Sequence, residues 1–143
     1  MTIILIDTNV LIDYLSGRDP YFKFADEIIQ LCRDGKVVGY MSAHSVPNMF
    51  YILRKDYSAD IRRIMIKSLF DILNVSGLDG NKLLTALNRE DFKDFEDCLQ
   101  DECAITVHAE YIVTINVKDY SFSRVKAVSP EKFVSIYKMC SGS

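Results

Sequence analysis

Short apolar runs alternate with longer amphipathic stretches along the chain. The runs are rich in β-branched residues and are bounded by polar or turn residues, which is typical of strands buried on both faces of a parallel sheet. They span residues 3–6, 37–41, 75–78, 111–114 and, more weakly, 125–128. The amphipathic stretches between them predict helices. These helices are expected at residues 9–15, 22–33, 43–55, 59–73, 81–87, 92–107 and from 130 onward.

The expected helix boundaries rest on local capping signals. Side chains suited to cap a helix N-terminus precede several of the helices, namely Asp7 with Thr8, Ser42, Ser58 and Ser129. Pro130 stands at the first position of the last helix, where its missing N–H costs nothing. Gly35 is suited to end the second helix in a left-handed conformation.

Strands that alternate with helices predict an α/β fold, in which a central parallel sheet is covered by helices on both faces. The length of 143 residues fits one domain, which we expect to span residues 1–140 and to leave 141–143 as a flexible tail. In open parallel sheets, functional groups gather at the carboxyl ends of the strands. The residues that directly follow each strand are therefore the first candidates for a site.

Composition places the chain among ordinary globular proteins, with 49% hydrophobic and 26% charged residues. Its formal net charge of -3 counts mildly against a nucleic-acid partner, because attraction to phosphates usually comes from basic patches. An RNA-binding protein of this charge would need a local basic patch, a metal or a partner. Asp7 interrupts the first apolar run, and no run reaches membrane-spanning length. We therefore expect a cytoplasmic protein.

The cysteines and histidines do not suggest a zinc site. The four cysteines form no C-x-x-C pair and have no histidine cluster beside them; they are Cys32, Cys98, Cys103 and Cys140. We expect them to be buried, reduced thiols. The two histidines, His44 and His108, are expected at the surface or in caps.

Acidic residues stand at several points that the fold would bring together. Asp7 directly follows the first strand, and its role as a helix cap leaves one oxygen free for another ligand. Asp94 and Asp97 lie three positions apart near the start of a predicted helix, so they share a face, which Asp101 continues. Asp119 lies just beyond the strand at 111–114.

Each acid also has a simpler explanation. Asp94 and Asp101 are adequately explained by a solvated helix face and by the helix dipole, whereas apolar neighbours place Asp97 near the buried boundary. Asp119, with Thr114 and Asn116, is equally compatible with a polar loop. Taken together, acids from three segments at one sheet edge would repel each other unless a cation bound there. Hard oxygen ligands favour Mg²⁺ or Mn²⁺.

Several motifs resemble those of the PIN-domain family. The segment Ile4-Leu5-Ile6-Asp7-Thr8-Asn9 is similar to the family's opening motif, Asp94-Phe95-Glu96-Asp97-Cys98-Leu99-Gln100 to a central acidic helix, and the stretch from Tyr111 to Tyr120 to the closing segment. Residues 128–133 resemble the tail that follows it. The resemblance spans nearly the whole chain in the same order, and it points to VapC-like ribonucleases.

This resemblance implies a three-layer α/β/α sandwich and a ribonuclease that depends on Mg²⁺ or Mn²⁺. Asp7, Asp97 and Asp119 would bind the metal, and Asp94 would support the site. Thr8, Asn48, Thr114 and Asn116 would contact or orient the substrate. Many bacterial members are toxins that an antitoxin protein holds in check, and members often pair, so an antitoxin partner and a homodimer are expected by resemblance.

One departure from the family concerns Asn48. The family usually places a glutamate early in the helix after the second strand, and Asn48 takes that place here. The resemblance includes a subgroup that has asparagine at this point. An amide oxygen can bind a metal but carries no charge and is a poor base. The alternative to an active nuclease is therefore a catalytically attenuated PIN-fold module that binds RNA or a protein partner.

Two further interpretations were weighed. The basic residues Arg54, Lys55, Arg62, Arg63 and Lys67 could contact RNA phosphates, although a solvated helix face explains them better. A receiver-like or nucleotide-binding α/β protein is the third candidate. The chain has no G-x-x-x-x-G-K loop and no identifiable pair of a phosphoacceptor aspartate and a lysine, so this candidate ranks last.

Overall fold

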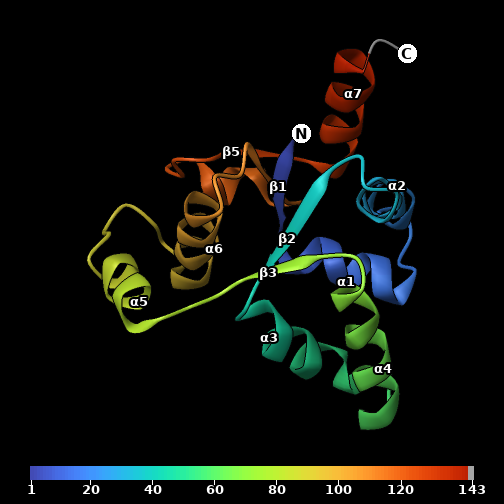
Figure 1. The fold of residues 1–143 in the computed structure, drawn as a ribbon. Helices are drawn as coiled ribbons and strands as arrows, with labels where there is room; N and C mark the ends of the chain where they lie inside the picture. The colour runs from blue at the N-terminus through green and yellow to red at the C-terminus, as the bar shows by residue number, and fades with distance from the viewer. Residues whose placement is uncertain (142–143) are drawn as a thin grey trace.

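A five-stranded, all-parallel sheet forms the centre of the computed structural model, which describes residues 1–141 (Figure 1). Its strands follow the spatial order β3-β2-β1-β4-β5. Their bounds are β1 Ile3–Ile6, β2 Val38–Ser42, β3 Asn74–Ser76, β4 Tyr111–Val113 and β5 Lys126–Val128. With β1 in the middle, the residues after β1 and β4 meet at the carboxyl edge. The expected parallel sheet is confirmed.

The side chains of β1 alternate between two hydrophobic cores. Ile4 and Ile6 are fully buried in the larger core, whereas Leu5 is fully buried in the smaller core on the other face of the sheet. An alternation with period two places successive side chains on opposite faces. Because both faces are covered, the strand is apolar throughout, as its sequence predicts.

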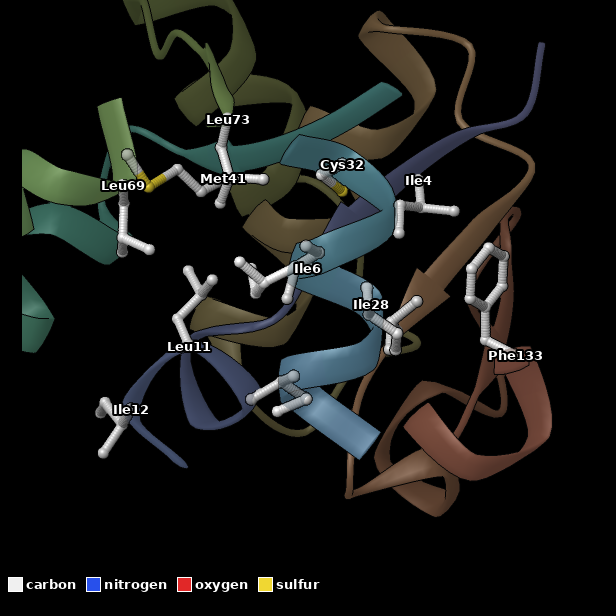
Figure 2. Packing of buried hydrophobic residues seen from close by; sticks show 14 of the residues in the cluster. Ile4, Ile6, Leu11, Ile12, Ile28, Cys32, Met41, Leu69, Leu73 and Phe133 are labelled. Carbon is white, nitrogen blue, oxygen red and sulfur yellow. The ribbon is translucent and has the colours of Figure 1, made fainter. Parts of the chain in front are cut away.

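The larger core lies beneath five helices: α1 Thr8–Ser16, α2 Phe22–Arg33, α3 Ser45–Ile52, α4 Ala59–Phe70 and α7 Pro130–Cys140. Figure 2 shows Leu11 of α1, Ile28 of α2 and Phe133 of α7 within this cluster. The smaller core lies beneath α6 Phe95–Thr106, on which α5 Gly80–Leu87 packs. The molecule is thus a three-layer α/β/α sandwich, as expected.

Gly39 of β2 permits the close approach of α2 to the sheet. A Cβ atom built at Gly39 would lie 2.6 Å from the Cys32 sulfur and 2.7 Å from a methyl carbon of Leu73. These distances are shorter than van der Waals contact, so a Cβ atom here would require the side chains of Cys32 and Leu73 to move. The absent side chain therefore sets the spacing between α2 and β2.

Most of the capping predictions are confirmed. The side chains of Asp7, Ser58 and Ser129 each accept a hydrogen bond from a backbone N–H in the first turn of their helices. Gly35, after the end of α2, has a φ of 71°. Ser42 is the exception. It ends β2 instead of capping a helix, and α3 begins only at Ser45.

Other boundaries differ by a few residues. α6 begins at Phe95 instead of residue 92, because Asp94 is its N-cap. α4 ends at Phe70, and short 3-10 helices occupy Leu53–Lys55 and Val117–Tyr120. The flexible tail was expected at residues 141–143, of which 142–143 lie outside the described residues. Ser141 itself donates a backbone hydrogen bond to Tyr137.

The prediction for the cysteines is correct for Cys32, Cys98 and Cys103, which are buried thiols, and wrong for Cys140, which is exposed at the end of α7. The apolar face of α7 turns Phe133 and Val134 inward and leaves its last residue in solvent. Within residues 1–141, every helix is too short or too polar to cross a membrane.

Candidate functional site at the carboxyl edge of the sheet

Asp7 is the centre of a hydrogen-bond network at the carboxyl edge. Its backbone N–H donates to the carbonyl of Val113, which ties the end of β1 to β4. Its carboxylate is only 5% exposed and accepts from the Thr8 N–H at 2.8 Å, the Gln100 amide at 3.0 Å and the Thr114 hydroxyl at 2.8 Å. The predicted cap at Asp7 is confirmed, and the same carboxylate also accepts hydrogen bonds from two side chains of distant segments.

The pKa of Asp7 is shifted by opposing effects. Burial raises it above its ordinary value, and the hydrogen bonds from Thr114, Thr8, Tyr120 and Gln100 oppose that rise. Hydrogen bonds to a carboxylate favour its charged form, whereas loss of hydration disfavours it. Several hydrogen-bond donors therefore hold the Asp7 carboxylate in a fixed orientation at the sheet edge.

Asp97 lies in the first turn of α6 and meets Asp7 through Tyr120. The Tyr120 hydroxyl lies 3.1 Å from Asp7 Oδ2 and 3.3 Å from Asp97 Oδ1. A hydroxyl has one proton, so the two carboxylates share a single donor. Burial, followed by the charges of Asp94 and Asp7, raises the pKa of Asp97 to about 7. These two acids come together from segments 90 residues apart in the sequence.

Glu96 adds an acid to this group. Its Oε1 accepts a hydrogen bond of 2.6 Å from the side-chain amide of Asn48 on α3. Burial and the neighbouring charges of Asp7 and Asp94 raise the pKa of Glu96, and the bond from Asn48 opposes the rise. Glu96 stands within the acidic motif of the sequence but was not among the predicted site residues. Its position beside Asp97 was the available signal.

Asp94 and Asp119 complete the acidic group from its exposed side. Asp94 caps α6 by accepting from the Glu96 N–H at 2.8 Å, and its charge raises the pKa values of Glu96 and Asp97. Asp119 lies in the 3-10 helix and contributes to the raised pKa of Asp97. Asp94 therefore acts both as a cap and as part of the charged group.

A buried polar layer supports Asp7 from below. The Gln100 amide nitrogen lies 3.0 Å from Asp7, 3.3 Å from the Thr8 hydroxyl and 3.2 Å from the Ser45 hydroxyl. The hydroxyls of Thr8 and Ser45 are also hydrogen-bonded to each other at 2.7 Å, and the Ser42 hydroxyl donates to the side-chain oxygen of Gln100. Three residues of this network were not among the predicted site residues: Gln100, Ser45 and Tyr120. Their only signal was a place beside or within the recognised motifs.

Thr114 and Asn116 differ in their exposure to solvent. Thr114 is fully buried and donates to Asp7, so it orients that carboxylate. Asn116 is exposed, and its backbone N–H donates to the Thr114 hydroxyl at 3.0 Å. The predicted contact of the Asn116 side chain with a substrate stays a prediction.

The expectation for Asp101 is wrong, and the one for His44 is correct only in its position. Asp101 does not lie on a solvated face: it is fully buried, pairs with Arg89 at 2.8 Å and accepts from the backbone N–H groups of Arg124 and Val125. His44 occupies the N-cap position of α3, as expected, but its side chain makes no capping hydrogen bond, and within residues 1–141 both of its ring nitrogens are buried without a hydrogen-bond partner. Burial lowers its pKa to about 4. His108 is exposed as expected.

A hollow of about 430 Å³ opens onto part of the acidic group. Its lining includes Asp94, Asp97 and Asp119. Within residues 1–141, none of five acids lies within 4 Å of a basic side chain: Asp7, Asp94, Glu96, Asp97 and Asp119. Such uncompensated oxygen donors suit a hard divalent cation. In this part of the chain, however, no three acidic, histidine or cysteine side chains are gathered closely enough to coordinate one ion together.

Comparison with known protein families shows to which family the chain belongs. Residues 3–118 match the family model for the PIN domain. The chain belongs to the PIN-domain family. The match covers β1, α3, the acidic start of α6 and β4, and it ends at residue 118, just before Asp119 and Tyr120. No curated protein matches the chain.

Solved structures with the same fold come from several bacteria. A toxin–antitoxin complex from Klebsiella pneumoniae has a TM-score of 0.66 at 20% identity and covers 89% of this chain and 97% of that chain. VapBC2 from Rickettsia felis, bound to a promoter DNA fragment, has a TM-score of 0.64 at 15% identity, covering 90% and 98%. VapC20 from Mycobacterium tuberculosis, described as a toxin that cleaves the sarcin–ricin loop, has 0.62 at 14%, covering 76% and 86%.

Proposed function

We propose that this PIN domain is a metal-dependent endoribonuclease and the toxin of a toxin–antitoxin pair. The observation that carries the proposal is the group of five acids without basic partners at the carboxyl edge of the sheet. Like charges at close range are costly, and a bound cation would relieve that cost. The PIN-domain match supports nuclease chemistry, and the similar bacterial toxins support the biological role.

The residues present fit a hard divalent cation by their chemistry. Asp7, Asp97 and Asp119, which are not close enough together in this structure to coordinate one ion jointly, would close around Mg²⁺ or Mn²⁺, and Asp94 and Glu96 would add negative charge beside it. When bound, such an ion supplies a Lewis acid and lowers the pKa of its water for attack on a phosphodiester. The family resemblance leads us to expect a metal, and the oxygen ligands of these acids support it.

The surrounding residues have their own tasks. Thr114, Gln100 and the Thr8 N–H fix the Asp7 carboxylate, so that its oxygens need not reorganise during the reaction. The Tyr120 hydroxyl holds Asp7 and Asp97 near each other. Asn48 holds Glu96 in place, so on this account it acts on the site through a carboxylate and not by the direct substrate contact expected for it.

The alternative is an attenuated module that keeps the fold and binds RNA or a protein. Its support is the uncharged side chain at Asn48. Glu96 weakens that argument, because it brings a carboxylate to the same place. An antitoxin partner and a homodimer also belong to the proposal. Exposed apolar side chains on α3 and α4, including Tyr51 at 62% and Ile64 at 66% exposure, offer a surface for such contacts.

Titration calorimetry with Mn²⁺ tests the metal site. We expect binding by the native protein, loss of binding in Asp7→Asn and Asp97→Asn, and native affinity in Asp60→Asn, whose carboxylate on α4 is 94% exposed and away from the site. Native protein that folds but binds neither Mn²⁺ nor Mg²⁺ would contradict the nuclease proposal and leave the binding module.

A further inference from the structure

A basic track leaves the acidic hollow along the segment that joins β4 to β5. A second hollow, of about 550 Å³, is lined by Lys118, Arg124 and Lys126. It shares Lys118 and Ser121 with the lining of the acidic hollow. The two hollows therefore adjoin at these two residues, with acids on one side and cations on the other.

The cations of this track have no acidic partners. Within residues 1–141, Lys118, Arg124 and Lys126 are exposed and form no ion pair within 4 Å, and the same holds for Lys93 on the rim of the acidic hollow. Asp101 accepts hydrogen bonds from the backbone N–H groups of Arg124 and Val125, and its carboxylate pairs with Arg89. Asp7 and Asp97 bond to this segment through the Tyr120 hydroxyl and not through its cations. The side chains of the track are thus available to an external anion.

Phe122 stands where the acidic hollow meets the track. It lines the acidic hollow and is 64% exposed. Because most of this ring is exposed, core packing does not explain its presence here. Aromatic side chains beside a positively charged groove stack unpaired bases, and duplexes do not offer such bases.

We propose that the segment from Lys118 to Lys126 binds single-stranded RNA, with phosphates on Lys118, Arg124 and Lys126 and an unpaired base stacked on Phe122. This inference rests on the proposed ribonuclease function and names its substrate class. It also explains how a chain of net charge -3 holds a polyanion: the negative charge gathers at the cleavage site, and the cations gather beside it.

The test is fluorescence anisotropy of a labelled, unstructured RNA of about 12 nucleotides, in EDTA, where a metal-dependent nuclease leaves the RNA intact. The variant Lys118→Ala/Arg124→Ala/Lys126→Ala should weaken binding and reduce the slope of log affinity against log salt by about 2. Phe122→Ala should weaken binding about 5- to 100-fold and leave the salt slope unchanged. The native protein should bind an RNA duplex of the same length more weakly than the single strand.

The matched control is Lys55→Ala/Arg63→Ala/Lys67→Ala with Phe70→Ala, which removes exposed cations and an exposed ring from the α4 side of the molecule. We expect this control to bind RNA as the native protein does. The inference is overturned if the control weakens binding and the track variant does not, if neither does, if the duplex binds as tightly, or if the native protein binds no RNA in EDTA. None of these results depends on the outcome of the metal titration, so a failure of this inference is distinguishable from a failure of the proposed nuclease function.

Discussion

The side-chain amide of Asn48 lies 2.6 Å from Glu96 Oε1, so a residue of α3 holds an acid of α6 at the edge of the functional site. Position 48 is where the family resemblance places a glutamate. The amide removes that charge, and the carboxylate that it binds restores one from a different helix. On this account the site keeps its negative charge although the expected acid is missing.

Loss of the Glu96 charge should weaken metal binding. We expect Glu96→Gln to reduce Mn²⁺ affinity about tenfold, because a neutral amide cannot offset the cation's charge. Asn48→Ala should have a smaller effect in the same direction, since it frees Glu96 without neutralising it. Calorimetry measures both, with Glu131→Gln in the first turn of α7 as the control. Native affinity in Glu96→Gln would exclude Glu96 from the site.

The stability of the metal-free protein should depend on the protonation of Asp97. Its pKa is about 7 in the folded protein and 3.8 ordinarily, so the folded state binds more protons than the unfolded state between these values. The free energy of unfolding should therefore fall as the pH rises from about 4 to about 7. The raised pKa values of Asp7 and Glu96 act in the same direction.

Urea unfolding in EDTA at about pH 5 and about pH 8 measures this slope. Asp97→Asn should reduce it, Asp60→Asn should not, and Mn²⁺ should stabilise the native protein most at the higher pH. An identical slope in Asp97→Asn and the native protein would show that Asp97 is not the group that titrates.

The Tyr120 hydroxyl should contribute to stability through its two acidic partners. Tyr120→Phe keeps the ring, which packs edge-to-face on Phe92, and removes the donor to Asp7 and Asp97. We expect the free energy of unfolding to fall by about 1–2 kcal/mol, because buried carboxylate oxygens lose a partner. Urea unfolding checks this value against Tyr21→Phe, an exposed control. No difference between the two variants would remove Tyr120 from the network.

A side chain at Gly39 should lower the stability of the protein, and a smaller residue in place of Cys32 should relieve part of that loss. Gly39→Ala places a Cβ atom 2.6 Å from the Cys32 sulfur and should cost about 1–3 kcal/mol of stability. In the double variant with Cys32→Ala, the two costs should sum to less than their separate values. Gly77→Ala, where nothing lies within 4 Å, is the control. Strict additivity in the double variant would show that the sulfur is not the obstacle.

The sequence predicted the features that depend on neighbouring residues. The apolar runs located the sheet, and local caps such as Asp7 and Ser129 located helix starts. The carboxyl-edge rule led to Asp7, and helix spacing led to Asp97.

Contacts between distant segments escaped prediction. Gln100 and Tyr120 reach Asp7 across 93 and 113 residues, so only the folded topology brings them together. Asp101 was misjudged for the same reason: its partner Arg89 lies in a loop whose path the helix pattern does not specify. The pairing of Asn48 with Glu96 likewise needs α3 and α6 placed side by side.

The most direct test of the account is cleavage of labelled single-stranded RNA in Mn²⁺ by the native protein, Asp97→Asn and Asp60→Asn, with EDTA as the metal-free condition. The account predicts cleavage by the native protein and by Asp60→Asn, and none by Asp97→Asn or in EDTA. Asp97→Asn removes one of the charges that would hold the metal and keeps the shape of the side chain. Cleavage by Asp97→Asn at the native rate, or by the native protein in EDTA, would contradict the claim that these acids form a metal-dependent nuclease site.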